Sequence, residues 1–310
     1  MASASWFPNN RVLLAVILGA FVALSGCRTP PVYAAPAGDE IIVAGKRFST
    51  GTRVVTWREP GGYNGYAVKP AAHGRRTLGR TKATERTPTL PELQKHVDRF
   101  VLHYDAAGLS RACFEILKKR GLSVHFLLDV DGTIYQTLDL QERAWHAGAS
   151  NDRSIGIEIA NIGAYAPVDA KTLGAWYRLG PAGQTRLVPP ASAGDPRLLR
   201  PGAGSRPQRP DPVKGRIHER DLVQYDFTPE QYAALIKLTA ALHRAFPRIR
   251  LDYPRDRSGR LLTTRLPESQ LDDYRGLVGH FHLQTDKLDP GPAFQWDAVL
   301  NGAKRELEKK

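Results

Sequence analysis

The pattern of apolar and polar residues predicts regular structure most clearly from residue 97 onward. Residues 99–105 read Arg-Phe-Val-Leu-His-Tyr-Asp, which is apolar on both faces of an extended chain and indicates a central strand. Residues 110–120 carry a helical pattern, for which Ser110 is the expected cap and Gly121 the stop. A strand followed closely by a helix is the first sign of an α/β protein.

Two further extended segments follow this helix. Residues 123–138 predict a hairpin that turns at Asp131-Gly132. Residues 154–161 read Ser-Ile-Gly-Ile-Glu-Ile-Ala-Asn and predict another strand, whose isoleucines share one face. Gly156 and Glu158 then point to the other face, where a carboxylate needs a reason to be present.

Turn-forming residues dominate the next part of the chain before it becomes helical again. Between Gly180 and Gly215 there are 6 Gly and 8 Pro, so this stretch is expected to be a long surface insertion without regular elements. Thr228 then starts a helix as part of a capping box, and residues 294–308 predict a shorter amphipathic helix. The expected fold class is therefore α/β, a single mixed central sheet flanked by helices.

The N-terminus carries an export signal. Residues 12–24 form an apolar run of 13, which is too short to span a bilayer and ends in Leu-Ser-Gly-Cys. This ending resembles a bacterial lipobox, which implies cleavage before Cys27 and acylation of its thiol. Arg28 follows in place of the Asp that favours inner-membrane retention, so the expected location is the periplasmic face of the outer membrane. The alternative is ordinary signal cleavage that leaves Cys27 free.

Charge and cysteine content narrow the choice of partners. The 44 Lys and Arg residues against 31 Asp and Glu give a net charge of +13, which favours an anionic partner. Because the chain is expected to be exported, nucleic acid is not expected as that partner. The two cysteines exclude a disulfide-rich scaffold, and Cys113 is expected on the buried side of its helix.

The same patterns divide the chain into three parts. Residues 1–26 are the expected signal peptide, and residues 27–95 form a tether and an N-terminal extension to which the sequence assigns no role. Residues 96–310 form the main domain, with the insertion at about residues 166–225.

Candidate chemistry gathers around two histidines and an aspartate. His103 lies near the end of the first predicted strand, and His280 precedes Asp289 by nine residues in a Gly/Pro-rich loop. One loop can bring His280 and Asp289 to the same point. Two imidazoles and one carboxylate are a common catalytic zinc set that leaves one position open for water.

Five motifs carry a family resemblance. The segments VLHYDA, HFLLDVDGTIYQ, AWHAG, SIGIEIAN and GHFHLQTDKLDPGPAF occur in the order seen in zinc-dependent N-acetylmuramoyl-L-alanine amidases of the type 2 family, which includes the peptidoglycan recognition proteins. The resemblance covers residues 97–165 and 226–300. It implies the fold of that family, with the Pro/Gly-rich insertion as an addition.

The resemblance also implies roles for individual residues. Zinc would be held by His103, His280 and Asp289, with Glu158 as the general base that activates water and Lys287 stabilising the oxyanion. The substrate would be contacted by Trp145, His146 and Asn161. Some branches have a catalytic tyrosine where Val124 stands here, so the chain resembles the branch that uses glutamate.

The second histidine of Gly279-His280-Phe281-His282 departs from the family pattern, which often has Asp there. Either His280 or His282 could therefore face the metal, and the motif alignment favours His280. We expect His280 to end a buried strand and His282 to lie at the start of a loop, where its side chain is mobile unless other groups hold it. His125, on a strand, is expected to be structural.

The resemblance implies a peptidoglycan amidase that hydrolyses the bond between N-acetylmuramic acid and L-alanine in cell-wall turnover or recycling. The expected partners are peptidoglycan or muropeptides, and the membrane through the lipid on Cys27. Three alternatives stay open: a non-catalytic peptidoglycan-binding lipoprotein, a zinc peptidase that cuts within the stem peptide, and a purely structural lipoprotein.

Overall fold

A computed structural model describes residues 38–68, 88–196 and 198–309 of the chain. The predicted signal peptide, the predicted acylation site Cys27 and most of the tether lie outside the described residues. Within the described ranges, no helix is long and apolar enough to cross a membrane.

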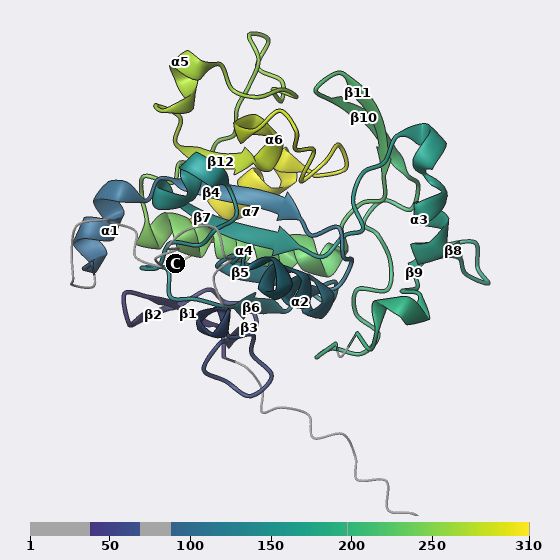
Figure 1. Ribbon diagram of the computed structural model, residues 1–310, viewed down its shortest axis with the longest axis horizontal. Helices are drawn as coiled ribbons and strands as arrows, with labels where there is room; N and C mark the ends of the chain where they lie inside the picture. Colours follow the sequence, from purple (N-terminus) through teal and green to yellow (C-terminus); the bar gives the residue numbers. More distant parts are fainter. Residues whose placement is uncertain (1–37, 69–87, 197, 310) are drawn as a thin grey trace, which may run out of the picture. The chain divides into compact units, whose positions relative to one another are not determined.

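The core of the fold is a six-stranded mixed sheet in the order β12-β4-β7-β5-β6-β3 (Figure 1). Neighbouring strands are parallel except for the pair β5–β6, which forms the predicted hairpin. The strands are β3 (Val54–Thr56), β4 (Arg99–Tyr104), β5 (Phe126–Leu128), β6 (Ile134–Gln136), β7 (Ser154–Ile159) and β12 (Gly276–Gly279). The mixed α/β sheet expected from the sequence is confirmed.

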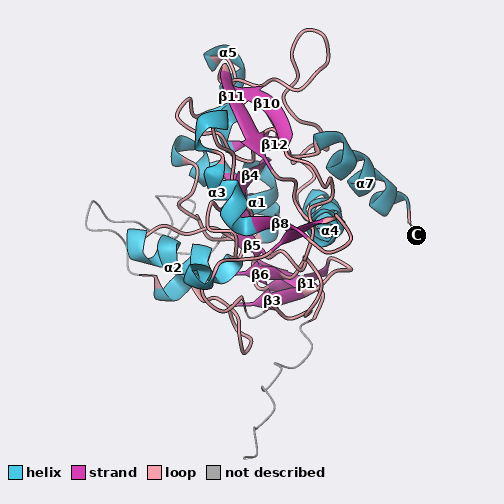
Figure 2. Ribbon diagram, turned by 90° about the vertical axis from the view of Figure 1, so that its right-hand side faces the viewer, coloured by secondary structure: helices cyan, strands magenta, loops and turns pink. Residues whose placement is uncertain are grey.

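Helices cover both faces of this sheet. Figure 2 shows α4 (Pro229–Ala245) and α7 (Trp296–Glu308) on one side and α2 (Ser110–Arg120) on the other. The main core, which includes Phe100 and Leu102 of β4 and Ile155 and Ile157 of β7, packs on the side of α4 and α7. The opposite face is the one toward which His103 and Glu158 alternate.

The helix ends follow local sequence rules with one exception. Thr228 and Gln231 form the predicted capping box of α4, and Gly121 ends α2 in the left-handed conformation at φ 61°. The expected cap Ser110 is instead the first helical residue, and Leu109 occupies the cap position.

The segment before residue 95 contributes directly to the sheet. The hairpin of β1 (Glu40–Val43) and β2 (Lys46–Ser49) leads into β3, which pairs in parallel with β6. The buried Gln136 amide fixes this arrangement, because it accepts from Ile42 N and donates to Ile42 O, both at 2.8 Å. Residues 40–56, whose role the sequence left open, thus supply the last strand of the central sheet.

The insertion contains more structure than the sequence predicts. Two hairpins form there, β8 (Tyr177–Leu179) with β9 (Thr185–Leu187), and β10 (Val213–Ile217) with β11 (Arg220–Gln224). The expectation of no regular elements between residues 180 and 215 is therefore wrong. Strands of three to five residues fit between the Gly and Pro turns, and long-range packing of buried side chains such as Tyr177 and Val223 stabilises them.

Short helices complete the chain. The remaining α-helices are α1 (Leu90–His96), α3 (Lys171–Trp176), α5 (Glu268–Leu271) and α6 (His280–Leu283), and the 3₁₀ turns are η1 (Gly65–Ala67), η2 (Gly148–Arg153), η3 (Pro167–Asp169) and η4 (Ala191–Ala193).

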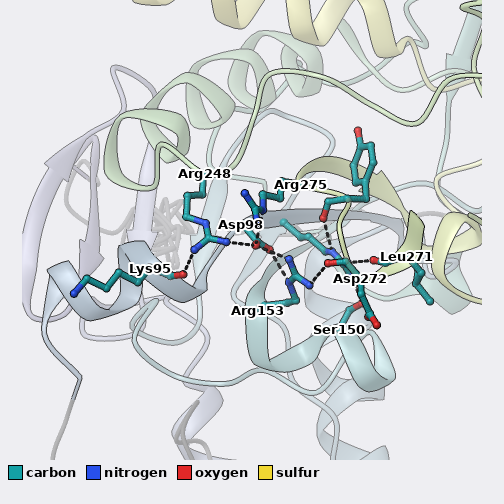
Figure 3. A network of polar contacts seen from close by, with 10 residues as sticks. Lys95, Asp98, Ser150, Arg153, Arg248, Leu271, Asp272 and Arg275 are labelled. Atoms are coloured by element: carbon teal, nitrogen blue, oxygen red, sulfur yellow. Dashed lines mark hydrogen bonds and ion pairs between the residues drawn. The ribbon is translucent and has the colours of Figure 1, made fainter. Parts of the chain in front are cut away.

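A cluster of charged residues joins the starts of three parallel strands (Figure 3). Asp98, 1% exposed, directly precedes β4. Arg153, just before β7, binds both carboxylate oxygens of Asp98 at 2.8 and 2.5 Å. Arg248, which follows α4, and Arg275, just before β12, approach the same carboxylate at 3.3 and 3.7 Å. One buried carboxylate thus holds together the chain segments that lead into the central strands.

We expect Asp98→Asn to destabilise the protein by about 2–4 kcal/mol, because the substitution removes the charge that compensates the clustered arginines. Urea-induced unfolding measures this change. Asp221→Asn is the matched control, since Asp221 pairs with Arg216 at 3.1 Å on the surface and its loss should cost less than about 1 kcal/mol. Equal effects of the two substitutions would contradict the central role of Asp98.

Candidate metal centre

Strand register brings the candidate residues together. His103 of β4 lies directly opposite Glu158 of β7 in the parallel pair. On the other side of β4, Gly279 of β12 lies opposite Leu102, so the next residue, His280, leaves the sheet beside His103. Because parallel strands end at the same edge of a sheet, three sequence-distant motifs meet there.

Asp289 completes the cluster from the loop after α6. Its Oδ2 lies 2.7 Å from His103 Nδ1 and 3.1 Å from His280 Nδ1. All three side chains are buried, and each offers a ligand atom within 4.8 Å of the others. Burial favours a raised pKa for Asp289, but the nearby His280 and the hydrogen bonds from both histidines outweigh it and lower this pKa.

The cluster fits a zinc ion. Tetrahedral zinc bonds of about 2.0–2.1 Å place neighbouring ligand atoms about 3.3 Å apart. The two nitrogen–oxygen distances of 2.7 and 3.1 Å are slightly shorter than this and need only a small outward movement. Burial also lowers the pKa of His103, which favours the neutral imidazole that a metal requires.

His146 lies against the candidate ligand His103. His146 Nδ1 is 3.0 Å from His103 Nε2, and His146 Nε2 is 3.3 Å from Ser154 Oγ. If His103 binds metal through Nδ1, its Nε2 carries the proton and donates it to His146. The ring of His146 rests where Gly156 has no side chain, since a Cβ there would lie 2.5 Å from the imidazole. The predicted substrate contact of His146 stays a prediction, whereas its contact with His103 is a feature of the structure.

Glu158 presents a carboxylate beside the cluster. Its side chain is half-buried, and among the described residues no group forms a hydrogen bond with it. Burial raises its pKa well above the ordinary value, and the negative charges of Asp289 and Asp105 raise it further. A carboxyl group with a raised pKa is suited to both accept and donate a proton near neutral pH.

Lys287 and Trp145 both remain partly accessible. The Lys287 ammonium lies 3.2 Å from the Asp286 carboxylate, in the loop that leads to Asp289. The half-buried ring of Trp145 lies under the Arg143 guanidinium, 4.1 Å from the ring centre. Their predicted roles toward substrate stay predictions.

Asn161 faces inward. Its side-chain amide donates to Tyr225 O at 3.0 Å, and its Oδ1 accepts from Gly163 N at 2.9 Å and Gln224 Nε2 at 3.3 Å. With 3% of the residue exposed, this side chain holds backbone segments together. The structure thus favours a structural role over the expected substrate contact.

The expectation that His282 begins a loop is wrong, and its side chain is held in place. His280 and His282 belong to the short helix α6, and His282 is fully buried. Its Nδ1 accepts from Gly279 N at 2.9 Å, and its Nε2 donates to Leu262 O at 2.7 Å. Burial lowers the pKa of His282 to about 3, so the ring is neutral. Both nitrogens are engaged, which leaves His280 as the candidate ligand of the pair.

The structure also shows the hydrogen bonds of two further residues near the site, His125 and Asp105. His125 Nδ1 accepts from Gly156 N and its Nε2 contacts Glu142 O, as expected for a structural histidine. Asp105, which the sequence analysis did not select, accepts from the backbone N–H groups of Ala107, Gly108 and Asn161. Burial raises the pKa of Asp105 to about 7. Its position two residues after His103 is the signal that could have identified it.

One family model matches part of the chain. Residues 93–195 match the family model described as N-acetylmuramoyl-L-alanine amidase. The match includes His103, His146 and Glu158, and it ends before His280 and Asp289. The enzyme class expected from the sequence is the class of this family.

Solved structures of amidases resemble the chain distantly. One is the N-acetylmuramyl-L-alanine amidase AmiD from E. coli in complex with the substrate anhydro-N-acetylmuramic acid-L-Ala-D-gamma-Glu-L-Lys, at 21% identity, TM-score 0.36 and 72% of this chain covered. The match spans 61% of the AmiD chain, about three fifths of its length. AmpD (18% identity, TM-score 0.34) covers 74% of this chain and 96% of its own. The endolysin LysCS from Clostridium intestinale URNW (16% identity, TM-score 0.35) covers 70% and 88%. No curated protein matches the chain significantly.

The two neighbouring histidines should behave differently on substitution. His280→Ala removes a ligand and should abolish zinc binding. His282→Ala should retain zinc but lower the free energy of unfolding by at least about 1–3 kcal/mol, because Gly279 N–H and Leu262 C=O lose their buried partner. Metal content and thermal melting of both variants measure these outcomes. A metal-free His282→Ala beside a zinc-loaded His280→Ala would reverse the assignment.

Proposed function

We propose that the chain is a zinc-dependent peptidoglycan amidase that hydrolyses the amide bond between N-acetylmuramic acid and the L-alanine of the stem peptide. The observation that carries this proposal is the buried His103, His280 and Asp289 cluster beside the Glu158 carboxylate. Three ligand groups with one open position, next to a separate proton acceptor, are an arrangement suited to metal-assisted amide hydrolysis. The match of residues 93–195 to an amidase family model supports the choice of this amide bond as the one that is cleaved.

The chain's own residues divide the work as follows. Bound zinc would polarise the scissile carbonyl and lower the pKa of the attacking water. Glu158 accepts the proton of that water and later delivers it to the leaving amine of L-alanine, which its raised pKa favours. Lys287, two residues before Asp289 in the sequence, supplies positive charge for the developing oxyanion. His146 keeps His103 in the tautomer that presents Nδ1.

The net charge of the chain and the sequence of its N-terminus support a particular substrate and a particular location in the cell. Stem peptides carry several carboxylates, which suits a net charge of +13. We propose that residues 1–26 are a lipoprotein signal peptide, that Cys27 is acylated, and that the domain acts in wall turnover or recycling at the periplasmic face of the outer membrane. The apolar run followed by Leu-Ser-Gly-Cys supports this location.

Activity should depend on Glu158 independently of metal binding. The full chain in mild detergent should bind one zinc per molecule and release stem peptides that begin with L-alanine, and a chelator should abolish both. Glu158→Gln should keep the zinc and lose about 10²–10⁴-fold in turnover, because the proton acceptor is gone. Mass spectrometry of digested muropeptides and metal analysis measure these outcomes.

The products also separate the alternatives. Shortened peptides still attached to sugar would indicate a peptidase, and the absence of products together with retained wall binding would indicate a binding protein. Joint loss of zinc and activity in Glu158→Gln would place this residue among the ligands.

The membrane anchor should depend on a single thiol. Cys27→Ser should move the protein from the membrane fraction to the soluble fraction of the cell envelope, because no acyl chain can be attached to it. Immunoblotting of the separated fractions checks this. Unchanged membrane association, with the same apparent mass as the parent, would argue against lipidation at Cys27.

A further inference from the structure

The end of the insertion lies beside the loop that carries Asp289. β4 and β7 point toward the side of the sheet where the insertion lies (Figure 1). Gln224, the last residue of β11, is fully buried there. The neighbouring loop, residues 289–293, reads Asp-Pro-Gly-Pro-Ala and has the candidate ligand at its start.

The Gln224 amide spans this loop from one end to the other. Its Nε2 donates to Pro290 O at 3.1 Å, and its Oε1 accepts from Ala293 N at 3.0 Å. A Cβ on Gly291, which lies between them at φ 84°, would come within 2.2 Å of Gln224 Oε1. The amide is therefore packed directly on the loop backbone, at a position that only glycine leaves open.

Other hydrogen bonds hold the two ends of this loop: Phe281 N donates to Asp289 O at 3.2 Å, and the Tyr232 hydroxyl donates to Ala293 O at 3.3 Å. Pro290 and Pro292 have no N–H, so the two prolines reduce the backbone donors available in the loop. Arg209, also from the insertion, donates to the Ala293 carbonyl. Side chains of the insertion thus provide anchors for the loop that follows Asp289.

The same amide reaches the strand of the proposed base. Gln224 Nε2 also lies 3.3 Å from Asn161 Oδ1. Asn161 follows β7, the strand that carries Glu158. Asn161 Nδ2 in turn donates to Tyr225 O at 3.0 Å. Gln224 therefore connects the loop of Asp289 with the end of the Glu158 strand through buried hydrogen bonds.

We propose that Gln224 is a positioning residue of the metal centre, through which the insertion holds Asp289 in place. This inference rests on the proposed zinc site. A zinc ion requires its ligand atoms at nearly fixed positions, and groups that orient ligands typically change affinity by about 10–100-fold when removed. Gln224 uses a donor and an acceptor at opposite ends of one amide. Methionine, of similar length, provides neither, and ionised glutamate lacks the donor.

The test is the zinc affinity of Gln224→Met and Gln224→Glu, measured on the full chain in mild detergent by competition with a chelating dye. We expect Gln224→Met to raise the zinc Kd about 10–100-fold. Gln224→Glu should weaken binding as well, since its carboxylate faces the Pro290 and Asn161 oxygens. Circular dichroism of the metal-free proteins establishes that each variant is folded. If Gln224→Met does not fold, Gln224→Glu decides the question.

Two controls separate positioning from general stability. Gln208→Met makes the same chemical change at an exposed residue of the insertion and should leave the zinc Kd unchanged. Asp98→Asn destabilises the opposite end of the strands and should also leave it unchanged. The inference would be overturned if the folded Gln224 variants bound zinc with the same Kd as the unsubstituted chain. It would also be overturned if Asp98→Asn weakened zinc binding as much as the Gln224 substitutions do. A parent chain that binds no zinc would instead overturn the proposed function, and the inference with it.

Discussion

The parallel pairing of β4 with β7 and β12 is the constraint on which the site depends. It places His103 opposite Glu158 and lets His280 leave the sheet beside them, so residues separated by up to 177 positions meet without a dedicated loop. At the other end of the same strands, Asp98 joins the incoming segments through arginines. The sheet is thus fixed where the strands begin and carries its chemistry where they end, as expected for an open parallel arrangement.

Local sequence patterns predicted those strands and helices whose buried faces can be recognised from a few consecutive residues. The strand through His103, the strand through Glu158 and the capped helix after Thr228 are of this kind, because their apolar periodicity reports directly which faces are covered. The ligand set came from a family resemblance, and the structure brings all three residues together. The motif alignment favoured His280 over His282 as the ligand, and the hydrogen bonds that occupy both ring nitrogens of His282 support that preference.

Long-range contacts decided the features that the sequence missed. β3 joins the sheet because β6 offers a free edge, and the Gln136 amide then holds β1 nearby. The strands of the insertion are too short and too rich in turn residues to be recognised alone, yet their buried side chains form a second core. Asn161 and Gln224 face inward because their amides meet backbone groups from distant segments. Such partners are known only once the chain is folded.

The contact between His146 and Gly156 has a consequence for how this site can change over time. The His146 imidazole occupies the space that the Cβ of any other residue at position 156 would need, so a side chain there and this ring position exclude each other. Substitutions at positions 146 and 156 are therefore coupled during evolution. A lineage that acquires even alanine at position 156 has to surrender or reorient the histidine that supports His103, and sequences in which the two positions vary should show them changing together.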